Sequence, residues 1–565
     1  MLFIFLNWIY IFFIVMGVGI MLNSILHIRI SLFYTLLTGM FAEMLLIHIY
    51  AIWFPINEIF YFLNFLLALI GVIYHKNLTQ MQLSSTFSEW KSWRKSIKIL
   101  GILLSILILM QTATRPFIVD NETYYIQSIK WLNEFGLVKG LANLHYFFGQ
   151  MSGWHLLQSG FNFGFLSSSL NNLNGFLMLI FTCFSLHHLN RFFEMKLTMD
   201  LFLGLIPVGN LFLFQFINVP SPDLPVFLIS QIIFYLFYRN YVNYQGDFRV
   251  LFLLCLLLFL SKITVAPLLI LPLVLMIRHK LFKKEAGISM LFAALTLTVF
   301  FLKNYLISGY LFYPTEFLSA WLNPDWKVAP ELQQFFFREI NAQLKSTFGA
   351  IQQTQNTKLE NFIHWIFEPG MRSIFNKLII LLLLIFPFYI YKNKTLFWLY
   401  IYAILQFGIL YFTAPQYRFF MPLIIGMGLY ILAKLLLKFP KKVIPFITFF
   451  SLIALIPLLF SLNVSNIKNS AFMPDKLQAF QTENIIVPPG NSLHHFEYET
   501  VKEGNLIYQS PLGEKVFFWI TSDGNLPCVN ATMIEYFKNS YGIRPQLRTE
   551  NLKDGFYSEK IIPER

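Results

Sequence analysis

The stretch that decides the fold is residues 97–125, IKILGILLSILILMQTATRPFIVDNETYY. Its first part, residues 97–114, is an apolar run of the length that crosses the hydrocarbon core of a bilayer as a helix. Its second part opens a polar loop that runs from Arg115 to Ser152 and carries Asp120 near its start. A span followed directly by such a loop predicts a membrane protein with a carboxylate at the mouth of its helix bundle.

The composition of the whole chain agrees with this prediction. Its 565 residues are 56% hydrophobic and only 13% charged, against about 25% charged residues in an average soluble domain. Apolar segments of about 17–25 residues recur along most of the length, and each is long enough to cross a bilayer. We therefore expect an all-α polytopic membrane protein with about 13–15 transmembrane helices. The apolar runs are continuous rather than alternating, which excludes a transmembrane β-barrel.

The predicted spans follow one another from the N-terminus almost to the tail. They lie at residues 3–22, 31–53, 58–74, 97–114, 154–168, 172–189, 201–217, 224–238, 249–261, 263–277, 286–303, 374–390, 395–412, 419–437 and 443–461. The segment at 154–168 is weakly apolar and is also compatible with an interfacial helix. No internal repeat is evident, which weighs against transporter folds built from repeated halves.

The positions of Lys and Arg predict the orientation of the helices. The net charge of +13 would suggest a nucleic-acid partner in a soluble protein, but here retention of basic loops in the cytoplasm explains it, and no nucleic acid is expected. The basic loops contain Arg29, Lys76, Lys91, Arg94, Lys95, Lys98, Arg191, Lys196, Arg239, Arg249, Arg278, Lys280, Lys283, Lys284, Lys392, Lys394, Lys438, Lys441 and Lys442. The alternate short loops hold only Lys262 and Arg418. This bias places residues 115–153, 304–373 and 462–565 on the extracytoplasmic side.

Three parts follow from this topology. Residues 1–96 form N-terminal helices and a cytoplasmic loop, residues 97–461 form the helical core, and residues 462–565 form a small α+β domain outside the membrane. Segments such as 484–487 and 515–521 read as strands between turn signals. The three cysteines lie in apolar runs or in the tail, so a disulfide framework is not expected. The N-terminus lacks the positive region of a cleavable signal peptide, and its first apolar segment is expected to stay as a helix.

Asp120 is the first candidate for chemistry. Residues 122–135 have apolar positions at helical spacing, and Gly136 is expected to end that helix. Aspartate is favoured as the N-cap of a helix, so Asp120 has a structural role open to it as well. The two roles are compatible, because a cap also holds a side chain in place. A carboxylate at the bilayer surface suits the removal of a proton from a hydroxyl group, and Glu122 is the nearby competitor.

The rest of this loop offers groups suited to holding a sugar, namely Asn143, His145 and Trp154. Each of them taken singly is also typical of a structured loop that packs on the bundle. No spacing of His, Cys and Asp here matches a zinc site, and no metal site is expected.

Other candidates lie in the remaining outer segments. Asp223 ends a second outer loop, where it either lines a site or serves as an ordinary helix start. Lys262 and Arg418 carry the only positive charges of the short outer loops, where they either neutralise a lipid phosphate or anchor their helices at the interface. Lys303 and Asn304, at the end of another span, face the same side.

These residues, in this order, resemble the GT-C superfamily of integral membrane glycosyltransferases, whose members carry an essential Asp in a large outer loop soon after a membrane helix. The likeness covers about residues 97–440 and is closest to a bacterial branch of mostly uncharacterised members. It is carried by Asp120, residues 124–131, 140–145, 220–223, 261–264, 304–309 and 415–419. In one respect the chain departs from the pattern, because Asp120 is followed by Asn121 where many members have a second acid. A divalent metal, the one cofactor considered, therefore lacks a paired-acid motif to support it.

The resemblance implies a polyprenyl-phosphate-linked sugar as donor and a glycan, a lipid or a protein as acceptor. Transfer would take place at the outer face of a bacterial cytoplasmic membrane, with inversion at the anomeric carbon. Asp120 would be the catalytic base, and Arg418 and Lys262 would hold the donor phosphate. The substrate would be bound by Tyr124, Asn143, His145, Trp154, Asp223 and Asn304.

Three other functions remain open at this point. An outer-face glycan polymerase or ligase would use similar basic outer loops, but usually with its main loop late in the chain. A flippase or transporter of lipid-linked glycans would need a charged path through the membrane and internal symmetry. A membrane scaffold would need none of the polar residues of the outer loops.

Overall fold

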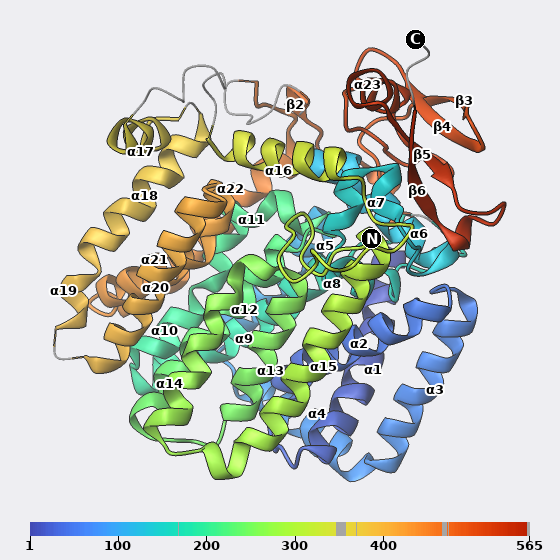
Figure 1. Cartoon of the computed structure of the whole chain (residues 1–565). Helices are drawn as coiled ribbons and strands as arrows, with labels where there is room; N and C mark the ends of the chain where they lie inside the picture. Colours follow the sequence, from blue (N-terminus) through green and yellow to red (C-terminus); the bar gives the residue numbers. More distant parts are fainter. Residues whose placement is uncertain are drawn as a thin grey trace.

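The computed structural model describes residues 1–561 apart from residues 168, 346–356, 369, 392, 466–471 and 473. The described chain is mostly helical, with a small region of strands near its C-terminus (Figure 1). Within these residues, ten helical segments are long and apolar enough to cross a membrane. This architecture is compatible with a multi-pass membrane protein.

Each of the ten segments coincides with a predicted span. They are α1 (Leu2–Ile25), α2 (Leu32–Trp53), α5 (Lys95–Thr112), α9 (Leu173–Met195), α10 (Thr198–Gly204) with α11 (Asn210–Ile217), α15 (Phe282–Ser308), α18 (Met371–Ile385) with α19 (Pro387–Ile390), α20 (Lys394–Thr413), α21 (Met421–Leu436) and α22 (Val443–Leu459).

The expected number of about 13–15 spans is higher than the structure supports by length and composition. Four of the surplus segments are short or only moderately apolar, namely α8 (Gly153–Ser159), α12 (Asp223–Val242), α13 (Phe248–Ser261) and α14 (Ile270–Arg278). Helices α12 and α13 are buried over most of their length. A helix buried in a bundle is apolar all round, as a spanning helix is, so hydropathy alone does not separate them.

The fifth surplus segment is α3 (Glu58–Tyr74). It bends by 85° into α4 (Lys76–Ser92), so that the two helices together meet the length and composition of one broken span. The sequence had placed residues 76–92 in a cytoplasmic loop. Helix α4 is largely exposed and polar, which explains why apolar periodicity did not find it.

The first three helices are packed tightly together. A Cβ atom on Gly39 of α2 would lie 1.8 Å from the carbonyl oxygen of Val15 in α1, so only glycine permits this approach. The trio also binds the rest of the bundle, because Trp8 Nε1 donates to the carbonyl of Asn172 at 3.2 Å. The N-terminal helices and the core are therefore one packed body.

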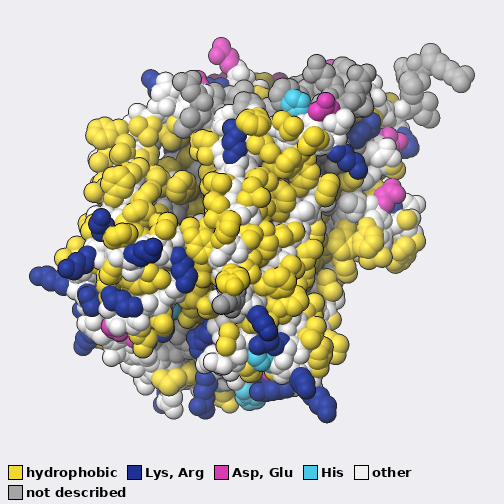
Figure 2. Space-filling view, turned by 90° about the vertical axis from the view of Figure 1, so that its left-hand side faces the viewer, with side chains coloured by type: hydrophobic (Ala, Val, Ile, Leu, Met, Phe, Trp, Pro, Cys, Tyr) yellow, Lys and Arg dark blue, Asp and Glu magenta, His cyan; other side chains and the backbone are white. Residues whose placement is uncertain are grey.

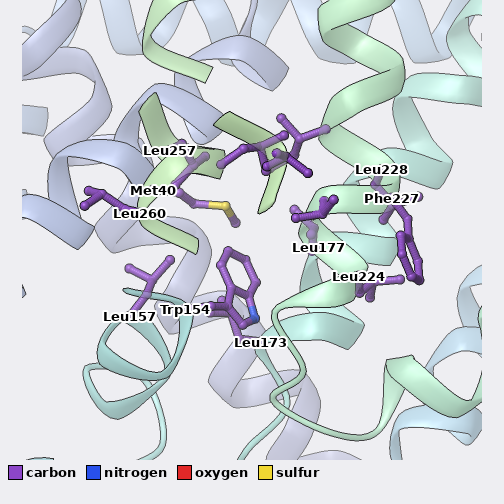
Figure 3. Close-up of a cluster of buried hydrophobic side chains, with 14 of the residues drawn as sticks. Met40, Trp154, Leu157, Leu173, Leu177, Leu224, Phe227, Leu228, Leu257 and Leu260 are labelled. Carbon is purple, nitrogen blue, oxygen red and sulfur yellow. The ribbon is translucent and has the colours of Figure 1, made fainter. Parts of the chain in front are cut away.

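The centre of the bundle is filled by large apolar side chains. Figure 3 shows Trp154 of α8 beside Met40 of α2, Leu173 of α9 and Leu257 of α13. All four are buried, and the indole of Trp154 is fully so. Burial of this kind stabilises each side chain by about 1.5–3 kcal/mol.

One face of the molecule is covered by a broad band of hydrophobic side chains, and Lys and Arg gather at one end of that band (Figure 2). Many exposed residues of the described helices are large and apolar, among them Phe388, Phe412, Leu384 and Leu452. A soluble monomer rarely exposes an apolar patch of this extent. The surface is that expected of helices in contact with lipid.

The C-terminal part is a small α+β unit at one end of the bundle, beside α6 (Ile126–Phe135) and α7 (Leu141–Leu144) (Figure 1). It consists of antiparallel pairs and one helix: β1 (Leu462–Asn463) with β2 (Lys476–Leu477), β3 (Glu497–Glu503) with β4 (Leu506–Leu512), α23 (Ala531–Tyr541), and β5 (Ile543–Leu547) with β6 (Phe556–Lys560). The expected strands at 484–487 and 515–521 are absent from this set. The second of these segments is an irregular stretch, in which Trp519 contacts Phe147 of the loop 115–152 and Phe518 packs on α23.

Candidate functional site

Four charged side chains that are far apart in the sequence meet at the end of the bundle, in a group that we call the charged cluster: Asp120, Asp223, Lys262 and Arg418. Arg418 Nη1 lies 2.5 Å from Asp120 Oδ2 and 3.5 Å from Asp223 Oδ2. Lys262 Nζ forms an ion pair with Asp223 Oδ1. The structure thus brings together the predicted base, the two predicted phosphate ligands and the second outer carboxylate.

Asp120 stands at the start of a π-helical turn, Asn121–Tyr125, which continues directly into α6. Its side chain makes no capping hydrogen bond, so the N-cap role open to it in the sequence is not used. Instead, Asp120 Oδ2 accepts from Arg418 and, at 3.3 Å, from the hydroxyl of Tyr125. Single π-helical turns are frequent at functional sites. As expected, the helix ends at Gly136, whose φ is 73°.

Asp223 and Lys262 form the closed side of the cluster. Asp223 is the first residue of α12, and its side chain is 2% exposed. Lys262 stands at the predicted tip between α13 and the 3-10 helix η4 (Ile263–Leu269), with its ammonium 3.9 Å from the ring centroid of Phe419. Removing one partner of a buried ion pair leaves the other charge without compensation at a high cost, so these two side chains stabilise one another.

Arg418 and Asp120 form the open side. Arg418 lies in the 3-10 turn η5 (Tyr417–Phe420), which leads into α21, and its Nε donates to Gln416 Oε1 at 2.9 Å. Its side chain is 23% exposed and that of Asp120 is 27% exposed. A ligand from solution or from lipid can therefore reach this half of the cluster without unfolding the bundle.

Tyr124 lies beside the cluster but is largely buried. Its ring stacks on Phe147 at a centroid distance of 5.7 Å and contacts Tyr125 and His155 edge-on. Burial, and then the charge of Asp120, raise the pKa of its phenol. Tyr124 therefore remains neutral and supports the turn that carries Asp120.

Asn143 and His145 are engaged in holding the outer loop to other segments. Asn143 Nδ2 donates to the carbonyl of Trp326 at 2.9 Å, and its Oδ1 accepts from Ser558 Oγ at 2.7 Å. His145 Nε2 lies 3.1 Å from the carbonyl oxygen of Trp519, and burial lowers the pKa of this imidazole to about 4. The structure gives both residues architectural contacts and does not bring them into the charged cluster.

Trp154 and Asn304 have similar roles. Trp154 is in the core, where Nε1 donates to Asn174 Oδ1 at 2.6 Å. Asn304 Nδ2 donates to the carbonyl of Leu311 at 2.9 Å, and the neighbouring ammonium of Lys303 donates to the carbonyl of Met151. The polarity of these residues, which suggested sugar binding, is used to join helices and loops.

Glu122 makes the contact that sequence reasoning missed. Its carboxylate is buried and accepts from Leu493 N at 2.9 Å, Ser492 Oγ at 2.6 Å and Ser522 Oγ at 3.0 Å. Its backbone carbonyl accepts from the amide groups of Thr521 and Ser522. The partners are about 370–400 residues away along the chain, so no local pattern could have indicated them. Glu122 fixes the C-terminal unit to the turn that carries Asp120.

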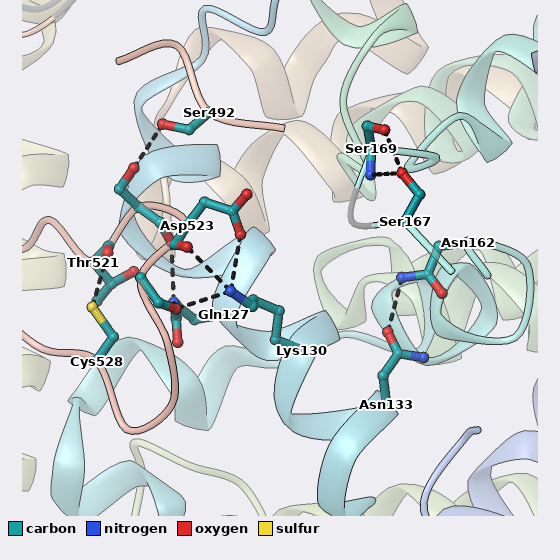
Figure 4. Close-up of polar contacts among 12 residues, drawn as sticks. Gln127, Lys130, Asn133, Asn162, Ser167, Ser169, Ser492, Thr521, Asp523 and Cys528 are labelled. Carbon is teal, nitrogen blue, oxygen red and sulfur yellow. Dashed lines mark hydrogen bonds and ion pairs between the residues drawn. The ribbon is translucent and has the colours of Figure 1, made fainter. Parts of the chain in front are cut away.

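The same interface extends along α6. Figure 4 shows Gln127 and Lys130 reaching the loop around Asp523. Lys130 Nζ lies 3.1 Å from Asp523 Oδ1, and Gln127 Nε2 donates to the carbonyl of Gly524 at 2.8 Å. The first turn of α6 is thus held by the C-terminal unit, which limits the movement of the preceding π-helical turn and of Asp120 at the start of that turn.

The cluster contains two carboxylates but no further ligand of the kind that metals prefer. Within the described ranges, no group of three or more His, Cys, Asp or Glu side chains is placed to hold a metal ion. Asp120 and Asp223 are instead each paired with a cation. The arrangement can release or accept a proton at Asp120 and can bind an anion at Arg418.

The fold and this cluster define a helical protein with many apolar spans and a charged site at the end of its bundle. Residues 1–425 match the model of a family described as a domain of unknown function (DUF8201), and the chain belongs to that family. No curated protein matches the chain, and no solved structure does so.

Proposed function

We propose that this protein is a membrane glycosyltransferase of the GT-C type, which moves a sugar from a polyprenyl-phosphate donor to an acceptor. The reaction takes place at the outer face of a bacterial cytoplasmic membrane, where the acceptor is a glycan, a lipid or a protein. The proximity of Asp120 to Arg418 carries this proposal, because it joins a base to a phosphate ligand in one accessible place.

Asp120 acts as the general base. It takes the proton of the acceptor hydroxyl while that oxygen forms a bond to the anomeric carbon of the sugar. The bond from this carbon to the donor phosphate breaks at the same time, and its electron pair stays on the phosphate oxygen. Attack from the side opposite the phosphate inverts the anomeric carbon. Support comes from the position of Asp120, which is partly exposed at the bundle end and caps no helix.

Arg418 and Lys262 bind the donor phosphate. In the unliganded arrangement their charges are matched by Asp120 and Asp223. A phosphate, like a carboxylate, carries negative charge and has oxygen atoms that accept hydrogen bonds. It can therefore take the place of Asp120 on Arg418 through two parallel hydrogen bonds. The exchange leaves the Asp120 carboxylate free to accept a proton, and it places positive charge where negative charge develops on the leaving phosphate.

The direct test is sugar transfer by the purified protein in lipid, supplied with a panel of polyprenyl-phosphate sugars and cell-envelope acceptors. Asp120→Asn should abolish transfer and keep the melting temperature near the wild-type value. It should bind the donor at least as tightly as the wild type, because its carboxylate no longer competes with the phosphate for Arg418. Asp325→Asn is the matched control, since Asp325 is an ion-paired aspartate on the surface, 64% exposed. Equal transfer by wild type and Asp120→Asn would remove Asp120 from the mechanism.

A flippase for lipid-linked glycans, or an outer-face polymerase or ligase, would use the same cluster differently. A flippase would move the intact donor between the leaflets and form no new glycosidic bond. A polymerase or ligase would consume a lipid-linked oligosaccharide rather than a single sugar. Analysis of the products and of leaflet exchange in the same vesicles separates these functions from the one proposed.

A further inference from the structure

A cavity of about 610 Å³ lies between the end of the bundle and the C-terminal unit. Arg115, Phe117 and Phe214 line it from the side of the bundle, and His494 and Lys515 line it from the C-terminal unit. A volume of this size holds one or two sugar residues, since pockets for small molecules measure about 300–1,000 Å³.

The lining carries a small excess of positive charge. Arg115, Lys476 and Lys515 are the cations and Asp475 and Glu514 the acids, and of these five side chains only Arg115 is partly buried. Burial, and then repulsion from Lys515 and Arg115, lower the pKa of His494. Lys515 and Arg115, which come from opposite sides of the cavity, therefore both act on His494, and an anion bound beside His494 would relieve this repulsion.

Two aromatic rings line the bundle side of the cavity, and we call this pair the Phe117–Phe214 floor. Their ring centroids lie 6.1 Å apart, and both side chains are partly exposed. Flat apolar rings beside charged groups suit a ligand that has one apolar face and one charged edge. A free phosphate ion would use only the cations, whereas an anionic sugar would use both surfaces.

The cavity wall is connected to both carboxylates of the charged cluster. Leu493, which also lines the cavity, donates its backbone N–H to Glu122, two residues after Asp120. On the other side, Asn218 Nδ2 donates to the carbonyl of Arg115 at 2.8 Å, in the loop that leads to Asp223. A ligand held in the cavity therefore lies against the two loops that supply the carboxylates of the charged cluster.

We infer that this cavity is the acceptor subsite and that it binds an anionic sugar, whose phosphate or carboxylate is held by Arg115 and Lys515 over the Phe117–Phe214 floor. That the bound sugar is the acceptor rests on the proposed function, whereas the anionic-sugar site does not depend on it. The charge contacts fix one end of the sugar, so that a hydroxyl group at the other end points toward Asp120.

The experiment is a binding titration of the full-length protein in lipid nanodiscs, with glucose 6-phosphate, glucuronate and neutral glucose as probes. The wild type should bind the two anions at least tenfold more tightly than glucose. The double variant Arg115→Gln and Lys515→Gln should lose at least tenfold in affinity for the anions and leave glucose unchanged. Lys441→Gln, at an exposed lysine outside the cavity, should behave as wild type. The stronger of the two anions identifies whether phosphate or carboxylate is preferred.

Equal binding of anions and glucose by the wild type, no binding at all by folded protein, or wild-type anion binding by the double variant would each overturn the inference. The same experiments distinguish failure of the proposed function from failure of this inference. Asp120→Asn should bind the anions as the wild type does. Anion binding that depends on Arg115, in a protein that transfers no sugar, would contradict the proposed transferase function and support the anion site. Transfer that depends on Asp120 but not on Arg115 or Lys515 would support the transferase function and contradict the role of the cavity as the acceptor subsite.

Discussion

Arg418 Nη1 lies 2.5 Å from Asp120 Oδ2, although 298 residues separate the two in the chain. The contact joins the turn before α6 to the turn before α21, and Asp223 completes it from the start of α12. Two carboxylates and two cations in one cluster leave no excess of charge, so an incoming anion must displace a carboxylate. This exchange is the basis of the first prediction.

Arg418→Gln should weaken binding of a polyprenyl-phosphate sugar by roughly 10–100-fold, because charge-assisted hydrogen bonds to phosphate contribute about 1.5–3 kcal/mol. Arg418→Lys should recover only part of this loss, since an ammonium cannot offer two parallel donors. The measurement is donor affinity by titration of the protein in nanodiscs.

Arg548→Gln is the matched control for Arg418→Gln. Arg548 also forms an ion pair with an aspartate, Asp325, through Nη2 at 2.7 Å, but on the surface of the outer loops. Its variant should bind the donor as the wild type does. Equal weakening in both variants would show that the loss reflects general destabilisation and would contradict the role of Arg418.

The buried pair of Asp223 and Lys262 should matter for stability. Lys262→Gln removes the nearer of the two cations beside the carboxylate of Asp223, which is 2% exposed, and leaves only Arg418 at 3.5 Å. Breaking a buried ion pair costs about 3–5 kcal/mol, and we expect a loss of stability up to that size. The double variant with Asp223→Asn should recover part of this loss, because it removes the buried charge. Thermal unfolding in detergent measures both variants. Lys560→Gln, at a surface pair with Glu331 in which the lysine is 71% exposed, should leave the melting temperature unchanged.

Glu122 should make docking of the C-terminal unit depend on pH. Burial raises the pKa of its carboxyl above the ordinary value of 4.5, against the opposing effect of its hydrogen bonds to Ser492, Leu493 and Ser522. The folded state thus favours the protonated form. Its contribution is fully present below about pH 4.5 and is lost as the pH rises through the raised pKa.

Glu122→Gln should remove this component of the pH profile. The readout is the difference in melting temperature between variant and wild type from pH 4 to pH 8, which should grow with pH. Glu497→Gln, at an exposed strand position, should leave a constant difference. A constant difference for Glu122→Gln as well would show that its carboxyl does not couple docking to protonation.

Asn143→Ala separates the architectural role from sugar binding. Its side chain bonds to Trp326 and Ser558, and leaving buried partners unsatisfied costs about 1–3 kcal/mol. We expect a lower melting temperature with unchanged donor affinity. A loss of donor affinity in a variant of wild-type stability would instead support the predicted role of Asn143 in sugar binding.

Hydropathy predicted the ten long apolar segments of this chain, because a helix that crosses a bilayer must be apolar over about 20 residues. The charge bias predicts the orientation of these segments, and that orientation remains a prediction. The apolar runs overcounted at α12 and α13, where neighbouring helices replace lipid as the apolar surroundings. Polar α4 was missed for the opposite reason, since its exposed faces carry little periodic signal.

The sequence predicted the charged residues of the candidate site, but it did not predict the roles of its other polar residues. Asp120 was proposed because it opens a long polar loop directly after an apolar run, and Asp223 because it is a carboxylate at a helix start. Lys262 and Arg418 were proposed because positive charges are rare in the short loops predicted to lie outside. The structure places all four together. Polarity alone did not separate ligand-binding side chains from those that hydrogen-bond within the fold. The role of Glu122 depends on partners in the C-terminal unit, which only the folded chain brings near.

The most direct test of the central claim is a cryo-electron microscopy structure of the wild-type protein in nanodiscs with a non-hydrolysable polyprenyl-phosphate sugar. We predict that the donor phosphate lies within hydrogen-bond distance of Arg418 and Lys262, and that Asp120 has left Arg418 and faces the anomeric carbon. A donor phosphate bound elsewhere, with the ion pair of Arg418 and Asp120 still intact, would contradict the claim.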